Sequence, residues 1–198
     1  MVWVELVAAI VSALAVWLTA LRRLSSCPTG VASVVLYAWV FVTARLYSDA
    51  LLQGIFGVMI IYGWVHWSRH LEDDGRVRVA RLAPRLAMLH VMAGVAGSLV
   101  LGYVMQRWTN AALPWLDSAL AAFSLVGQWW QSRRHLAAWW LWIVVDVIYV
   151  GEYIYKGLDI TSVLYAGFVV LAVLGLRKWR RAAEADRSQA AVHQHASS

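Results

Sequence analysis

Hydrophobic and polar positions are segregated along the chain into long blocks instead of alternating over short periods. Apolar runs of about 17 to 25 residues are typical of membrane-spanning helices. Seven such runs lie at 3–21, 31–48, 50–67, 86–105, 116–132, 139–155 and 160–177. The breaks between them fall at Pro28-Thr29-Gly30, Ser48-Asp49, Arg69 to Arg85, Asn110 to Pro114, Arg133-Arg134 and Lys156-Gly157. The pattern predicts an all-α integral membrane protein with one seven-helix domain over 1–182 and a frayed or disordered polar tail over 183–198.

Composition and charge agree with a membrane protein. The chain is 62% hydrophobic and 14% charged, whereas soluble domains carry about 25% charged residues. With seven spans, fourteen of the 17 Lys and Arg residues fall on the side of the C-terminus. Only Arg45, Arg107 and Lys156 fall on the other side. The positive-inside rule then predicts an outside N-terminus and a cytoplasmic C-terminus, and the net positive charge does not indicate nucleic-acid binding.

The first apolar run could be taken for a signal peptide, because Leu24-Ser25-Ser26-Cys27 resembles a lipoprotein cleavage box. A signal peptide has its positive charge before the apolar core, but Arg22 and Arg23 follow it here. The order of charges favours a retained first membrane helix. Cys27 is the one cysteine of the chain, which excludes an internal disulfide.

Two similar segments end the third and seventh runs, both reading Gly-x-x-x-Trp-x-Arg. They are Gly63, Trp67 and Arg69 in the third run, and Gly175, Trp179 and Arg181 in the seventh. Paired arginines end the first and fifth runs, Arg22-Arg23 and Arg133-Arg134, at an offset shorter by one position. Trp and Arg are common at cytoplasmic helix ends in any case, which is the alternative explanation. A true repeat would give a 3+1+3 parallel arrangement as in SWEET-type transporters: repeat 1 at about 1–69, a connector helix at 86–105, and repeat 2 at about 116–181.

The sixth run, WWLWIVVDVIYVGEYIY, contains an acid that membrane helices rarely carry. With Asp146 at zero on a helical projection, Trp139 lies at about +20°, Trp142 at about −40°, Tyr149 at about −60° and Tyr153 at about −20°. One interpretation is a pocket in which aromatic faces stack on a flat ring and Asp146 faces a positive charge. The other is that the tryptophans contact lipid and Asp146 bonds a neighbouring helix.

Three further features bear on this choice. Glu152 lies at the margin of the stripe, nearer the outer end, where water can reach it. The third run places Gln53, Phe56, Ile60, Trp64 and Trp67 on one face, and the fifth aligns Asp117, Ser124, Gln128 and Gln131. These polar groups either wall a cavity with the sixth run or hydrogen-bond between helices.

The sequence offers little for catalysis or cofactors. His66 and His70 are four residues apart, but no nearby Cys or Asp completes a metal site. No nucleophile motif, phosphate loop or paired-acid signature occurs, so we predict no enzyme activity, no metal and no cofactor. A retinal protein needs a mid-membrane lysine, whereas Lys156 and Lys178 lie at span ends.

The segments LLQGIFGVMIIYGWVHWSR and DSALAAFSLVGQWWQSRRHLAAWWLWIVVDVIYVGEYIYKGLDITSVLY resemble the Pnu family of vitamin transporters, which includes the nicotinamide riboside transporters. The resemblance runs from about Leu36 to Arg181. It implies a bacterial inner-membrane protein with a SWEET-like 3+1+3 fold, often a homotrimer. It also implies facilitated diffusion of a small-molecule vitamin across the lipid bilayer, with trapping by a cytoplasmic kinase.

The resemblance also implies site residues: Gln53 and Phe56, with Trp139, Trp142 and position 146. The nicotinamide riboside members have asparagine where this chain has Asp146, and they can have asparagine at the position of Ile60. Together with the helical faces, this gives eight candidate substrate-binding residues: Asp146, Trp142, Trp139, Gln53, Phe56, Tyr149, Trp64 and Gln128.

The acidic side chains narrow the choice of substrate. Asp146 beside Trp142 suits a cation such as nicotinamide riboside or thiamine, and favours neutral riboflavin less. A phosphorylated nucleotide fits poorly, because Asp146 and Glu152 repel it and no arginine is predicted at mid-membrane depth. The main hypothesis is therefore uptake of nicotinamide riboside; thiamine uptake is the alternative, and a membrane ligand sensor is the third hypothesis.

Overall fold

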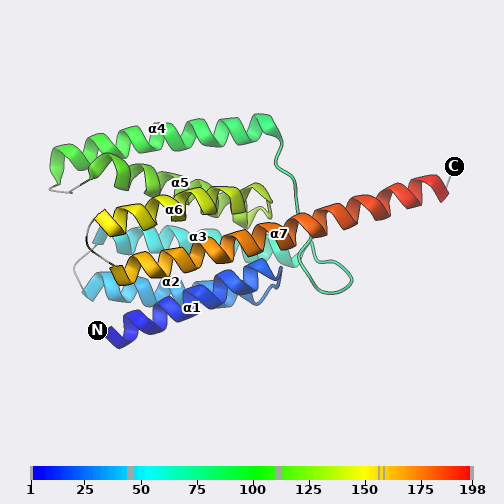
Figure 1. Ribbon diagram of the computed structural model, residues 1–198, viewed down its shortest axis with the longest axis horizontal. Helices are drawn as coiled ribbons and strands as arrows, with labels where there is room; N and C mark the ends of the chain where they lie inside the picture. The colour runs from blue at the N-terminus through cyan, green and yellow to red at the C-terminus, as the bar shows by residue number, and fades with distance from the viewer. Residues whose placement is uncertain (1, 44–46, 110–112, 156, 158, 197–198) are drawn as a thin grey trace.

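The computed structural model describes residues 2–43, 47–109, 113–155, 157 and 159–196. Seven α-helices occupy most of these residues (Figure 1). They are α1 (Val2–Ala20), α2 (Ser26–Thr43), α3 (Tyr47–Ser68), α4 (Pro84–Trp108), α5 (Pro114–Ser132), α6 (Ala137–Tyr155) and α7 (Asp159–Ala196). Each predicted apolar run therefore corresponds to one helix, which confirms the all-α prediction.

Five of these helices are long and apolar enough to cross a membrane: α2, α3, α4, α6 and α7. The apolar part of α1 is shorter, over Leu6–Ala20. Helix α5 is more polar, with Asp117, Gln128 and Gln131 among its residues. The sequence places these polar groups on a single face of the fifth run. Helix α5 is therefore amphipathic, with one polar face.

Two predicted breaks lie inside helices. Helix α2 begins at Ser26, so Pro28 lies in its first turn and Thr29-Gly30 continue the helix. Proline is tolerated there because the first backbone N–H groups of a helix have no intrahelical acceptor. Helix α3 likewise contains Ser48-Asp49. The predictions for Arg45, Asn110 and Lys156 lie outside the described residues.

The C-terminal tail is helical, and the prediction of a frayed or disordered end from 183 is wrong. Helix α7 continues to Ala196 and extends well past the other helices (Figure 1). The tail is rich in alanine, the strongest helix former. Arg180 Nε lies 3.0 Å from Glu184 Oε1, an i,i+4 pair that supports the extension.

Six helices form a closed ring. The pairs in contact are α1 with α2, α2 with α3, α3 with α5, α5 with α6, α6 with α7, and α7 with α1. Helix α4 lies outside this ring and packs on α5 (Figure 1). Helices α3 and α7 are therefore on opposite sides of the ring, as are α2 and α6, and a ring of this kind has an interior.

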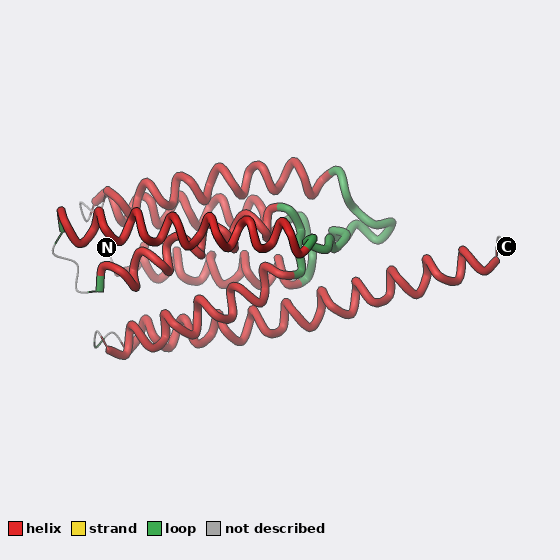
Figure 2. The backbone as a smooth tube through the Cα atoms, turned by 90° about the horizontal axis from the view of Figure 1, so that it is seen from above, coloured by secondary structure: helices red, strands yellow, loops and turns green. Residues whose placement is uncertain are grey.

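The turns that carry the arginine pairs lie at the end of the bundle opposite the N-terminus (Figure 2). Arg22 and Arg134 have left-handed backbone angles, with φ of 59° and 64°. Each donates its N–H to the carbonyl three positions earlier, at 2.9 Å in both turns. Arg22 and Arg134 thus share one turn geometry, at the same offset that relates Trp67 to Trp179. The paired arginines in the sequence suggest an offset shorter by one position.

The segment between α3 and α4, residues 69–83 and here called the strap, crosses the same end of the bundle. Val77 donates its N–H to the carbonyl of Arg22 at 2.9 Å. Arg22 Nη1 donates back to the carbonyl of Val77 at 3.2 Å and to Glu72 Oε1 at 2.6 Å. These bonds fix the strap to the turn between α1 and α2.

The strap is also fixed to the turn between α5 and α6. Ala80 donates its N–H to the carbonyl of Arg134 at 2.9 Å and accepts from Leu136 N–H at 3.1 Å. Arg134 Nη1 donates to the carbonyl of Arg78 at 2.9 Å. Residues 76–79 alternate arginine with valine, and the arginines are exposed while Val77 is buried, which is the pattern of an extended segment with one face inward.

Candidate functional site

Asp146 of α6 faces the inside of the bundle. Its exposed fraction is 8%, whereas Val144 and Val147 on the other side of α6 are each 53% exposed. No hydrogen bond or salt bridge to Asp146 occurs within the described part of the chain. A buried acid without such a partner is costly, which makes Asp146 a candidate functional residue.

Three aromatic rings, here called the tyrosine cluster, lie toward the C-terminal end of α6 from Asp146. They are Tyr149 and Tyr153 of α6 and Tyr165 of α7. Tyr149 and Tyr153 are stacked with centroids 5.7 Å apart, and Tyr165 of α7 lies 4.9 and 5.0 Å from them. The cluster joins α6 and α7 beside Asp146.

Toward the arginine-rich end lies the tryptophan cluster: Trp67, Trp139 and Trp179. The Trp179 ring centroid is 5.9 Å from that of Trp67 and 5.6 Å from that of Trp139. Trp139 and Trp179 are almost fully buried, at 1% and 0% exposure. Trp139 is therefore packed into a core at this level, although its indole Nε1 has no hydrogen-bond partner among the described residues.

This core closes the arginine-rich end of the ring. It combines Val77 of the strap with residues of five helices: Ala20, Cys27, Trp67, Trp139, Ala172, Leu176 and Trp179. Val77 is completely buried. Along α6, Asp146 therefore lies between the tryptophan cluster, which packs with the strap, and the tyrosine cluster.

Trp142 lies one turn from Asp146 and rests on α5. A Cβ built at Gly127 would lie 3.3 Å from the indole of Trp142, so the absence of a side chain there leaves room for the ring. Gln128 is the next residue of α5 and is half-buried. Trp142 also packs against the tryptophan-containing core. The structure thus brings Trp142, Asp146 and Tyr149 to one buried face of α6, as the helical projection predicts.

The α3 candidates lie on a helix that is separated from α6 by α5 along the ring. Gln53 and Phe56 are half-buried, and Trp64 is 38% exposed. Ile60 packs toward Gly30 of α2, where an added Cβ would lie 3.4 Å from its Cδ1. Because α3 contacts α2 and α5, its inner face can approach α6 only across the interior of the ring.

Glu152 is buried, and the expectation that it reaches water is wrong. Its exposed fraction is 5%, lower than that of Asp146. On the projection Glu152 lies about 120° from Asp146, near the direction of Val145 and Ala138. Those two residues are also buried. The buried face of α6 is therefore wider than the aromatic stripe, because α6 packs between α5 and α7.

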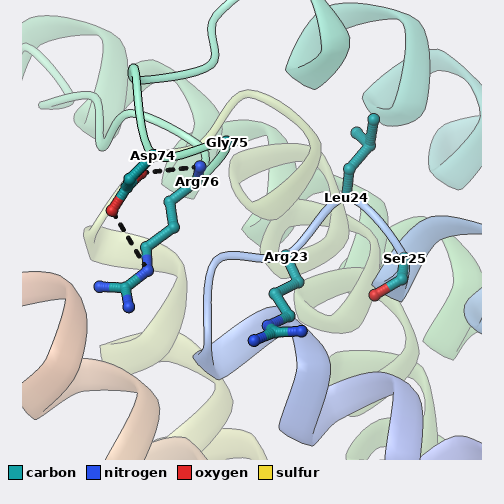
Figure 3. Close-up of a pocket in the computed structure, with 6 residues that line it drawn as sticks. All are labelled: Arg23, Leu24, Ser25, Asp74, Gly75 and Arg76. Carbon is teal, nitrogen blue, oxygen red and sulfur yellow. Dashed lines mark hydrogen bonds and ion pairs between the residues drawn. The ribbon is translucent and has the colours of Figure 1, made fainter.

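The larger of two described cavities is not at Asp146. It has a volume of about 400 Å³ and is bounded by Arg23, Leu24, Ser25 and the strap residues Asp74, Gly75 and Arg76 (Figure 3). Asp74 accepts from the Arg76 backbone N–H at 2.9 Å and pairs with its Nε at 3.3 Å. This cavity lies between the strap and the turn that follows α1. The burial of an acidic side chain makes Asp146 the stronger candidate for the functional site.

Known proteins are similar to this chain over most of its length. A family model described as nicotinamide mononucleotide transporter matches residues 2–181. The chain is 28% identical to the nicotinamide riboside transporter PnuC of Escherichia coli (strain K12), over 96% of this chain and 90% of that protein. It is 26% identical to the riboflavin/roseoflavin transporter RibM of Streptomyces davaonensis, over 64% of this chain and 61% of RibM. A crystal structure of the vitamin B3 transporter PnuC matches with a TM-score of 0.76 and 26% identity, over 92% of this chain and 82% of that one.

Proposed function

The chain belongs to the nicotinamide mononucleotide transporter family, and on this basis we propose that it carries nicotinamide riboside across the membrane by facilitated diffusion. The family is one of transporters, and the apolar helices make the chain a multi-pass protein of the bacterial inner membrane. The observation that carries the proposal is Asp146, buried between aromatic groups inside the helix ring.

Nicotinamide riboside suits this site because its pyridinium ring is flat and positively charged. Trp142 offers an aromatic face, and the attraction of a cation to such a face is worth about 2 kcal/mol when water is excluded. Asp146 would supply the negative charge that the cation needs in a buried setting. The further proposed contacts are Gln53, Phe56 and Trp64 of α3, Gln128 of α5, and Tyr149 and Trp139 of α6.

The phosphorylated form of this substrate is disfavoured by charge. A phosphate monoester carries a charge of about −1.5 to −2 at pH 7. It would enter a space beside the buried acid Asp146. Within the described residues, the buried arginines are Arg22 and Arg134, and both lie at the strap. The mononucleotide in the family description is therefore a poorer candidate for this chain than the riboside.

A 3+1+3 arrangement of parallel repeats is part of the proposal, with repeat 1 at about 1–69, α4 as the connector and repeat 2 at about 116–181. The helix contacts support it, because exchanging α1, α2 and α3 with α5, α6 and α7, respectively, maps the ring onto itself. Side-chain contacts also recur at the offset that relates Trp67 to Trp179. Tyr37 stacks on Phe41 at 5.9 Å, as Tyr149 does on Tyr153 at 5.7 Å.

The repeat extends to the hydrogen bonds between its halves. Trp67 Nε1 of α3 donates to the carbonyl of Ser132 in α5 at 3.1 Å. Trp179 Nε1 of α7 donates to the carbonyl of Thr19 in α1 at 3.0 Å. The two junctions are thus closed by the same type of bond, which suits halves that rock against each other around a central site.

We further propose that the N-terminus is outside and that the strap and tail are cytoplasmic, as the positive-inside rule requires. Transport is then uniport, with net uptake maintained by a cytoplasmic kinase that phosphorylates the vitamin, and homotrimeric assembly is expected from the family resemblance.

Thiamine is the second candidate substrate, because its thiazolium is also a flat cation that Asp146 and Trp142 could hold. Riboflavin is a third, since a relative named for riboflavin transport matches 64% of the chain. Riboflavin is larger and neutral, so it would gain little from Asp146.

A thermal-shift panel on purified protein distinguishes these substrates. A ligand at about 100 times its Kd stabilises the folded protein by about 2.7 kcal/mol. For a chain of this size that raises Tm by about 5 to 11 °C. Nicotinamide riboside should give the largest rise among the riboside, its mononucleotide, thiamine and riboflavin. A rise with the mononucleotide alone would contradict the charge argument.

A further inference from the structure

The strap is bonded to both halves of the ring at its arginine-rich end. Through Val77 and Glu72 it is tied to Arg22, in the turn between α1 and α2. Through Arg78 and Ala80 it is tied to Arg134 and Leu136, around the turn between α5 and α6. Any motion that separates these turns must break one set of bonds.

The strap also fills the space between the turns. Val77 has an exposed fraction of 0% and packs in the same core as Trp67, Trp139 and Trp179. Val79 packs against that core from the next inward position. A substrate leaving Asp146 toward the cytoplasm would have to pass this core, so the strap occupies the exit.

The two arginines that hold the strap occupy backbone positions that normally favour glycine. Arg22 and Arg134 both have φ in the left-handed region, at 59° and 64°. An arginine there carries backbone strain that glycine would avoid, and such strain persists where the side chain serves a purpose. At both positions the side chain is buried and bonded to a strap carbonyl.

We propose that the strap is the cytoplasmic gate of the transport path and that Arg22 and Arg134 are the residues that hold it shut. The inference rests on the proposed function and adds the gate and its positioning residues. Both arginines accept a strap N–H at their carbonyl and donate to a strap carbonyl, and Arg22 is also paired with Glu72, whose side chain is 19% exposed.

The test measures access to the strap by thiol labelling. Cys27 is replaced by alanine to remove the native thiol, and Val77→Cys is introduced as the reporter. Arg22→Gly is expected to raise the labelling rate at least tenfold, because glycine keeps the left-handed turn but lacks the guanidinium. Arg23→Ala, at the exposed neighbouring arginine, is the matched control and should leave the rate unchanged. Glu72→Gln should raise the rate by a smaller factor, since it removes only the charge of the partner.

Labelling is repeated with nicotinamide riboside, and substrate binding is measured separately by calorimetry. A gate predicts faster labelling while bound substrate cycles through the protein. Equal rates in Arg22→Gly and Arg23→Ala would overturn the proposal. So would a rate unaffected by substrate that calorimetry shows to bind, since a merely structural loop behaves in that way. Absence of binding heat would instead refute the proposed function, while the comparison of the two arginine variants would still decide whether Arg22 holds the strap.

Discussion

One added methyl group at Gly175 tests the packing of Trp139 directly. A Cβ at this position of α7 would lie 2.5, 2.5 and 2.6 Å from three atoms of the Trp139 ring. Gly167, two turns earlier in the same helix, has no atom within 4 Å of its added Cβ. Gly175→Ala and Gly167→Ala are thus the same substitution in the same helix, with and without a collision.

The expected difference follows from the geometry. Carbon atoms prefer separations of about 3.5 to 4.0 Å, so the overlap is roughly 1 Å. Trp139 cannot move freely, because Trp179 lies 5.6 Å away and both rings are buried. Overpacking of this kind costs about 1 to 3 kcal/mol. Replacing glycine by alanine in a helix gains about 1 kcal/mol in both variants and therefore cancels.

Thermal unfolding in one detergent measures this difference. A difference of about 1 to 3 kcal/mol corresponds to about 2 to 12 °C in Tm for a chain of this length, with Gly175→Ala the lower. Nicotinamide riboside binding should weaken in Gly175→Ala and stay unchanged in Gly167→Ala, because Trp139 is a proposed contact. Equal Tm values for the two variants would refute the packing of Trp139 on α7.

Three other predictions concern the halves, the pocket and pH. Trp67→Phe and Trp179→Phe should each lower the free energy of unfolding by a similar amount, about 0.5 to 1.5 kcal/mol, because each loses one indole hydrogen bond. Denaturation in detergent measures both losses. A much larger loss in one variant would contradict equivalent junctions between the halves. Gly127→Ala puts a Cβ 3.3 Å from Trp142 and should weaken riboside binding severalfold in calorimetry. An unchanged affinity would show that Trp142 does not contact the substrate. Burial and nearby arginine charge lower the pKa of His135, so the folded protein keeps it neutral and should lose stability as pH falls below about 6.5, the ordinary histidine value. Tm between about pH 7 and pH 5 should fall less in His135→Gln, and equal falls would contradict this. The ionisable groups that act on His135 are Arg133, Arg134 and His90.

The number of helices and the inward face of α6 could be predicted from the sequence because both depend on local periodicity. Asp146, Trp142 and Tyr149 share a face at about 100° per residue whatever surrounds them. The expectation that Glu152 reaches water rests on its position along the helix alone. Its burial depends on the packing of α6 between α5 and α7, which no single-helix projection contains.

The strap illustrates a different limit. In the sequence, 69–83 is a charged break between two apolar runs, and only the alternation Arg76-Val77-Arg78-Val79 indicates an extended segment with an inward side. The burial of Val77 needs residues from five helices, far apart in the chain. Trp139 is similar: its place on the aromatic stripe follows from periodicity, but its contact with Gly175 depends on the α6–α7 interface.

The central claim is that Asp146 holds a cationic vitamin inside the ring, and calorimetric titration of nicotinamide riboside into Asp146→Ala tests it most directly. Val144→Ala, on the exposed side of the same helix, is the control. We predict that Asp146→Ala weakens the riboside Kd at least tenfold, a loss of about 1.4 kcal/mol or more, while Val144→Ala binds like the wild type. A wild-type Kd in Asp146→Ala would show that the substrate site lies elsewhere.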